Sequence, residues 1–78
     1  MTDTSKFIVI KEAGKRCPWC EKAVTLLDSF GKTYSIRPLS GQRLINAARD
    51  ANMTTVPIIY HGVKLIGGYA DLHSYLKD

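Results

Sequence analysis

Hydrophobic residues along the chain alternate between short β-branched runs and stripes with helical spacing. The first run, Phe7–Ile10, lies between two lysines and predicts a strand that is buried on both faces. Downstream, apolar side chains three and four residues apart predict a helix from Pro18 to about Phe30. Gly31 can end this helix, because glycine readily adopts the left-handed conformation of a C-terminal cap. The chain therefore opens with a strand, a polar loop over 12–16 and a helix.

The middle of the chain repeats this pattern. Residues 33–37 alternate polar and larger side chains before Pro38, which predicts a second strand. Its connection to the first strand runs through a helix, so we expect the two strands to be parallel. Apolar and alanine positions over about 41–51 predict a second helix, for which Ser40 is a candidate N-terminal cap.

The last third predicts a hairpin followed by a helix. Pro57–Tyr60 and Val63–Ile66 are strand-like, and His61-Gly62 between them predicts a two-residue turn that joins an antiparallel pair. His61 is accordingly interpreted as a turn residue and not as a metal ligand or catalytic base. Two glycines then lead into a closing helix over Tyr69–Leu76.

Length and composition predict a single domain over residues 1–78, of which 1–5 resemble a loose terminus. The longest early apolar run is too short for a secretory signal or a membrane span, so we expect a cytoplasmic protein without membrane attachment. The net charge of +4 is spread along the chain, which favours small anions or acidic partners and gives little support for nucleic-acid binding. We expect a monomer.

The only two cysteines, Cys17 and Cys20, lie three residues apart at the predicted start of the first helix. Positions i and i+3 share a helix face, so the two sulfurs can close and reopen a short disulfide. Pro18 suits the first helical turn, where its missing N–H removes no helical hydrogen bond. The positive helix N-terminus, Lys15 and Arg16 favour the thiolate form of the first cysteine. We therefore expect Cys17 to be the nucleophile and Cys20 its resolving partner.

Two other interpretations of the cysteine pair remain open. A zinc site needs about four ligands, and only His61 and His73, which lack paired spacing, are available as further imidazoles. A purely structural disulfide would close a loop too short to remove much entropy from the unfolded chain. In a reducing cytosol, a catalytic pair is favoured over both, and no metal site is expected.

The predicted order of elements, with a cysteine pair at the first strand-to-helix junction, resembles the minimal thioredoxin fold, and three motifs resemble glutaredoxin in particular. These motifs are Cys17-Pro18-Trp19-Cys20, Thr55-Val56-Pro57, and Gly67-Gly68-Tyr69-Ala70-Asp71. The resemblance covers nearly the whole chain. It implies an α/β fold with a four-stranded mixed sheet, in the order β-α-β-α-β-β-α, flanked by three helices.

The resemblance also implies a glutathione site. Pro57 would follow a cis peptide bond and leave the Val56 backbone open to pair with a bound thiol peptide. The turn before the last helix would hold the γ-glutamyl end, where Asp71 could meet the ligand's ammonium group and also serve as a helix-start carboxylate. The residues assigned to glutathione binding in this way are Lys15, Trp19, Thr55, Val56, Pro57, Gly68, Tyr69, Ala70 and Asp71.

Some positions depart from the family's usual pattern. Three cations precede the first cysteine and compete for the glycine carboxylate of glutathione: Lys11, Lys15 and Arg16. We favour Lys15. Ile58 and Ala70 stand where polar residues are frequent in the family, which could weaken the affinity for glutathione. Trp19 replaces the more familiar tyrosine, and we expect its ring to line the binding groove.

The function expected from this resemblance is that of an enzyme, a glutathione-dependent thiol–disulfide oxidoreductase. Glutathione would be its co-substrate, no cofactor would be tightly bound, and protein disulfides and glutathionylated proteins would be its substrates, with ribonucleotide reductase as a family-level candidate. One alternative is a thioredoxin-like or ribonucleotide-reductase redoxin that is reduced by a flavoenzyme. Another is an iron–sulfur cluster carrier, in which Cys17 and glutathione hold a cluster across a dimer.

Overall fold

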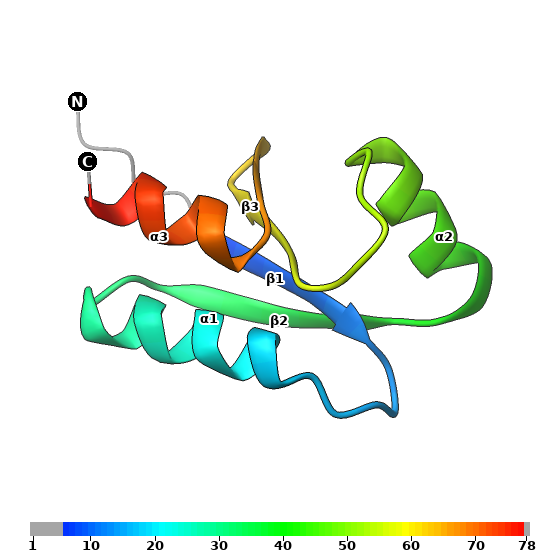
Figure 1. Cartoon of the computed structure of the whole chain (residues 1–78), viewed down its shortest axis with the longest axis horizontal. Helices are drawn as coiled ribbons and strands as arrows, with labels where there is room; N and C mark the ends of the chain where they lie inside the picture. The colour runs from blue at the N-terminus through cyan, green and yellow to red at the C-terminus, as the bar shows by residue number, and fades with distance from the viewer. Residues whose placement is uncertain (1–5, 78) are drawn as a thin grey trace.

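The computed structural model describes residues 6–77, and their seven elements follow the predicted order along the chain (Figure 1). The residues 1–5 that resemble a loose terminus lie outside the described part. The strands are β1 (Phe7–Glu12), β2 (Tyr34–Leu39), β3 (Ile58–His61) and β4 (Lys64–Gly67). The helices are α1 (Pro18–Ser29), α2 (Gly41–Asp50) and α3 (Tyr69–Lys77).

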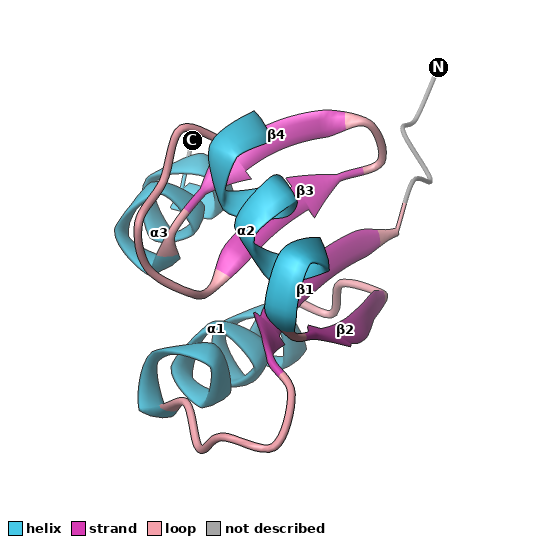
Figure 2. Cartoon of the chain, turned by 90° about the vertical axis from the view of Figure 1, so that its right-hand side faces the viewer, coloured by secondary structure: helices cyan, strands magenta, loops and turns pink. Residues whose placement is uncertain are grey.

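The four strands form one mixed sheet in the order β2-β1-β3-β4. Strand β1 pairs in parallel with β2 and antiparallel with β3, and β3 pairs antiparallel with β4. Helices α1 and α3 lie on one face of this sheet, and α2 lies on the other (Figure 2). The predicted fold, a minimal thioredoxin fold with three helices, is confirmed.

Successive side chains of β1 point to opposite faces of the sheet, so the strand contributes residues to a core on each face. Phe7 and Val9 pack towards α1 and α3 together with Leu27, Ile59 and Leu72. On the opposite face, the buried residues are Ile10, Ala51 and Ile58, and α2 covers them with partly buried side chains. Among the residues described, no side chain that is polar or charged is buried. Polar chemistry is therefore confined to the rims of the two cores.

The helix termini follow the sequence closely. Phe30 caps the C-terminus of α1, and Gly31 follows it with φ +67°, as predicted for a left-handed cap. Ser40 does occupy the N-cap position of α2, but its side chain makes no capping hydrogen bond. Within residues 6–77, no helix has both the length and the apolar character needed to span a membrane.

Strand β2 is longer than predicted, because Pro38 does not end it. Pro38 lies opposite Lys11 and the strand continues to Leu39. Since β2 is at the edge of the sheet and pairs only with β1, the missing proline N–H can face away from the ladder at no cost. The prediction of a strand that stops at Arg37 is therefore wrong by two residues.

The hairpin turn lies one residue further along the chain than predicted. His61 is the last residue of β3 and pairs with Lys64, so the turn consists of Gly62, with φ +65°, and Val63, which is fully exposed. The interpretation of His61 as a turn residue is wrong. Its ring stacks on Phe7 with centroids 4.1 Å apart, and its Nδ1 lies 2.8 Å from the Tyr75 hydroxyl. These contacts fix the register of the hairpin against the core.

Replacing a side chain in this small core should be costly. Leu27 is completely buried between α1 and the sheet, so Leu27→Ala is expected to lower the free energy of unfolding by about 2–5 kcal/mol. Leu65→Ala is the matched control, because Leu65 is 38% exposed, and we expect a loss of only about 1 kcal/mol. Urea denaturation followed by circular dichroism measures both, and equal losses would contradict the core described here.

Candidate active site

The cysteine pair lies at the start of α1, directly after the loop that connects it to β1. Cys17 is the N-cap of α1 with an extended backbone, Pro18 occupies the first helical turn, and Cys20 follows within that turn. The two sulfurs form a disulfide across a Cα–Cα distance of 5.2 Å. The helix start therefore holds the two sulfurs together, as the spacing predicts.

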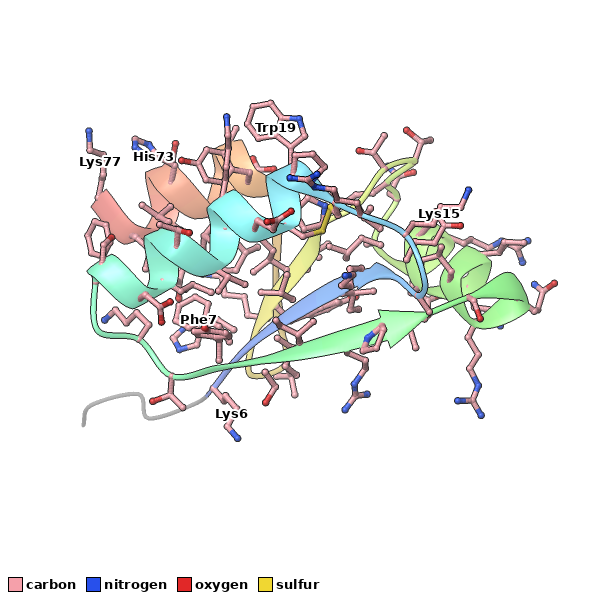
Figure 3. All side chains as sticks on the ribbon, turned by 90° about the horizontal axis from the view of Figure 1, so that it is seen from below. Lys6, Phe7, Lys15, Trp19, His73 and Lys77 are labelled. Carbon is pink, nitrogen blue, oxygen red and sulfur yellow. A yellow bond between two sulfur atoms is a disulfide. The ribbon has the colours of Figure 1, made fainter. Side chains whose placement is uncertain are left out.

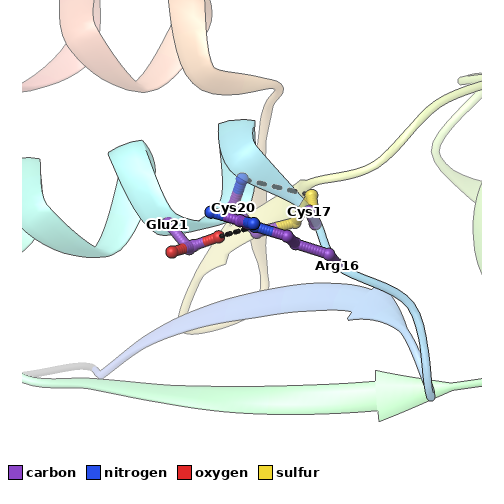
Figure 4. Close-up of polar contacts among 4 residues, drawn as sticks. All are labelled: Arg16, Cys17, Cys20 and Glu21. Atoms are coloured by element: carbon purple, nitrogen blue, oxygen red, sulfur yellow. Dashed lines mark hydrogen bonds and ion pairs between the residues drawn. A yellow bond between two sulfur atoms is a disulfide. The ribbon is translucent and has the colours of Figure 1, made fainter.

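The first sulfur also completes the helix terminus. The backbone N–H of Cys20 donates a hydrogen bond to Sγ of Cys17 at 3.1 Å (Figure 4). Both cysteines belong to the core cluster under α1, with exposed fractions of 8% for Cys17 and 4% for Cys20. Cys17 is the slightly more accessible of the two, and its role as the attacking residue stays a prediction.

The cations near the dithiol differ in what surrounds them. Arg16 forms an exposed ion pair with Glu21 at 3.6 Å, so part of its charge is already compensated (Figure 4). Lys11, on the face of β1 that points to α1, lines a hollow of about 240 Å³ together with both cysteines. Lys15 is exposed on the loop between β1 and α1 (Figure 3). Lys11 is thus the lysine that shares a hollow with the sulfurs.

The segment before β3 presents an open backbone. The Val56–Pro57 peptide bond is cis, as the family resemblance implies. The Val56 side chain packs against the core cluster that contains the cysteines. Among the hydrogen bonds of residues 6–77, none uses the Val56 N–H or carbonyl. Both groups are therefore available to a ligand that adds as an extended strand.

The turn before α3 is built around a carboxylate. Gly67 has φ +124°, and a Cβ there would collide with the side chain of Asp71. Oδ2 of Asp71 accepts a hydrogen bond from the Gly68 N–H at 3.1 Å. Asp71 thus serves as a helix-start carboxylate, one of its two predicted roles. The side chain is exposed, so its other oxygen can face a ligand.

A groove of about 410 Å³ joins these segments, and we call it the α3 groove. Its lining residues are Trp19, Met53, Thr55, Val56, Pro57, Gly68, Tyr69, Ala70 and Asp71. Trp19 is 54% exposed, and its ring lies 5.5 Å from that of Tyr69. Nζ of Lys22 lies 4.5 Å above the Trp19 ring. Apart from Lys15, every residue that the sequence analysis assigns to binding lines this groove.

Beyond Val56 the surface dips into a second hollow of about 370 Å³, which we call the α2 hollow. It shares Trp19, Thr55 and Val56 with the α3 groove, so the two adjoin along these residues, and we call them together the trough. Lys15 lines neither part of this trough. Its predicted contact with a glycine carboxylate stays a prediction.

Met53 is a lining residue that the sequence analysis did not identify. It follows α2 in the loop before Thr55, and its Cε lies 3.6 Å from the place that a Cβ on Gly68 would occupy. The only local signal was an apolar side chain between the end of a helix and the Thr-Val-Pro motif. Within residues 6–77, no three His, Cys, Asp or Glu side chains are grouped in a way that could hold a metal ion.

Comparison with known proteins identifies the family of this chain. The glutaredoxin family model matches residues 4–66. Glutaredoxin 3 of Escherichia coli K12 is 38% identical over 64 residues, which cover 74% of this chain and 72% of the relative. The glutaredoxin of Pseudomonas aeruginosa is 38% identical over 60 residues, with coverage of 74% and 71%.

Solved structures agree on the fold. Wheat glutaredoxin superposes with a TM-score of 0.78 at 21% identity, covering 97% of this chain and 74% of its own. A buckwheat glutaredoxin–glutathione complex gives 0.76 at 23% identity, covering 97% and 72%. With its matched motifs and its Cys17–Cys20 pair at the start of α1, the chain belongs to the glutaredoxin family of thiol–disulfide oxidoreductases.

Proposed function

We propose that this glutaredoxin uses glutathione as its co-substrate and reduces protein disulfides and glutathione mixed disulfides. The observation that carries the proposal is the α3 groove, which runs from the start of α3 past the open backbone of Val56 to the residues around the dithiol. The similar buckwheat protein has been solved as a complex with glutathione, which supports the same ligand for this groove.

The γ-glutamyl and cysteinyl parts of glutathione find chemical complements in the α3 groove. The γ-glutamyl carboxylate fits the free backbone N–H groups at the start of α3, and the ammonium group fits the carboxylate of Asp71. The cysteinyl residue pairs with the Val56 backbone as an added strand, which directs its sulfur towards Cys17. The rings of Trp19 and Tyr69 cover the aliphatic part of the ligand.

The dithiol route begins with Cys17 as a thiolate, which the Cys20 N–H and the positive start of α1 stabilise. The thiolate attacks one sulfur of a protein disulfide, a mixed disulfide forms, and the other substrate sulfur leaves as a thiolate. The Cys20 sulfur then attacks the Cys17 sulfur, releases the second substrate thiol and forms the Cys17–Cys20 disulfide. Two glutathione molecules reduce this disulfide and leave as glutathione disulfide.

Glutathionylated substrates need only the first cysteine. Cys17 attacks the glutathione sulfur, the protein thiol leaves, and a second glutathione attacks the resulting mixed disulfide to give glutathione disulfide. We further propose a cytoplasmic location, where a reducing glutathione pool would keep this cycle turning.

The choice of reductant tests the proposal directly. Turnover of a glutathionylated peptide is expected with glutathione, NADPH and glutathione reductase, and not with NADPH and thioredoxin reductase. The absorbance of NADPH reports both reactions. Turnover with thioredoxin reductase alone would instead favour a redoxin reduced by a flavoenzyme.

The two cysteines are expected to have separable roles. Cys17→Ser should abolish both reactions, because it removes the attacking sulfur. Cys20→Ser should abolish reduction of a protein disulfide but retain removal of glutathione from a glutathionylated peptide, which needs no resolving sulfur. Comparable loss of the second activity in both variants would refute this assignment.

Asp71 is expected to contribute to glutathione affinity through its charge. Asp71→Asn keeps an oxygen that can accept from the Gly68 N–H, but loses the charge that faces the ligand's ammonium group. The KM for glutathione should rise by about tenfold, since a hydrogen bond to a charged group contributes about 1.5 kcal/mol. Asp28→Asn is the matched control, because Asp28 lies in the last turn of α1 and bonds Tyr34. An unchanged KM in Asp71→Asn would contradict this role.

A further inference from the structure

The α2 hollow contains a single charged side chain. Its wall is made of Leu44 and Ala48 from α2, with Thr54 and Ile58 and the three residues that it shares with the α3 groove. Among its lining residues only Glu12 carries a charge. A ligand that extends beyond Val56 therefore meets a carboxylate on an otherwise mostly apolar surface.

The position of Glu12 follows from the alternation of side chains along β1. Ile10 packs on the face that α2 covers, and Glu12, two residues further on, emerges on that same face at the end of the strand. Its side chain is partly buried. Within residues 6–77 its carboxylate has neither an ion pair nor a hydrogen bond, so no cation of the described chain neutralises it.

The cations that precede the dithiol lie elsewhere. Lys11 points to the opposite face of the sheet and lines the hollow beside the cysteines. Arg16 is paired with Glu21, and Lys15 is exposed and lines no part of the trough. Of these charged residues, only Glu12 lines the α2 hollow.

The direction of the bound thiol decides which of its groups meets Glu12. A γ-glutamyl thiol with its ammonium group at Asp71 and its sulfur at Cys17 occupies the α3 groove up to Val56. Its remaining, C-terminal end is then directed past Val56, where the α2 hollow adjoins the groove. In glutathione this end is a carboxylate, and two like charges at close range repel one another.

We infer that Glu12 is a specificity residue, which disfavours a free carboxylate at the C-terminal end of the thiol ligand and selects glutathione-type thiols whose end is amidated, esterified or cationic. This inference rests on the proposed use of a γ-glutamyl thiol. The thiols selected in this way differ from glutathione only in the group at their C-terminal end, which lies in the α2 hollow.

The test uses the mixed disulfide of the Cys20→Ser variant, in which Cys17 exchanges with an oxidised thiol. The Cys17 thiolate attacks the disulfide of glutathione or of its glycyl ethyl ester, one mixed disulfide forms, and one small thiolate leaves. Mass spectrometry over a series of thiol-to-disulfide ratios gives the equilibrium constant for each thiol. The quantity of interest is the equilibrium constant for glutathione ethyl ester divided by the equilibrium constant for glutathione itself, which has the free carboxylate.

Glu12→Gln in the Cys20→Ser background should lower this ratio by about three- to fivefold, the size expected for a partly solvent-screened charge pair. Glu21→Gln in the same background is the matched control, because it removes an equal charge near Cys17 but outside the trough, and its ratio should not change. Differences in the intrinsic acidity of the two thiols cancel between variants. With Glu12 in place, the ratio should also fall at 1 M salt, where charges are screened within about 3 Å.

Three results would overturn the inference. They are an unchanged ratio in Glu12→Gln, an equal shift in Glu21→Gln, or a ratio that does not respond to salt when Glu12 is present. In each of these cases both thiols still form mixed disulfides, and the proposed function stands. If Cys17 forms a mixed disulfide with neither thiol, the proposed function fails and this inference fails with it.

Discussion

The double burial of β1 is the constraint on which the rest of this structure depends. The strand has a neighbour on each side and a helical layer over each face, so its side chains supply both cores. It ends at Glu12, and the short loop that follows must bring Cys17 back over the same sheet to begin α1. The position of the dithiol is thus determined by a strand that is packed on both faces.

The active site is assembled from segments that are distant in sequence and have little regular structure of their own. The N-cap of α1, the cis-proline segment and the turn before α3 each expose backbone groups that helices and strands would otherwise use. Each segment is anchored by an adjacent buried element, because Cys20, Ile58 and Leu72 all lie in the cores. Rigid anchoring and open backbone groups therefore occur side by side, and this combination suits the proposed binding of a peptide thiol in one orientation.

Much of the fold could be predicted from local patterns, because periodicity reports which face of an element is buried. The misplacements arose where distant residues decide the outcome. Pro38 remains within a strand because β2 has no outer neighbour, and His61 joins β3 because Phe7 and Tyr75 receive its ring. The family resemblance identified the groove residues of three motifs. It could not identify Met53, which belongs to none of them, or locate the side chain of Lys15, which depends on the path of an exposed loop.

Trp19 lies inside the redox motif and is the only tryptophan of the chain. Its indole ring is half exposed at the mouth of the groove, with a lysine ammonium on one side and the ring of Tyr69 nearby. Emission from an indole depends on neighbouring charges and on sulfur that can accept an excited electron. The tryptophan fluorescence of this protein therefore originates at the cysteine pair alone, and the chain carries its own optical reporter of oxidation state and of groove occupancy.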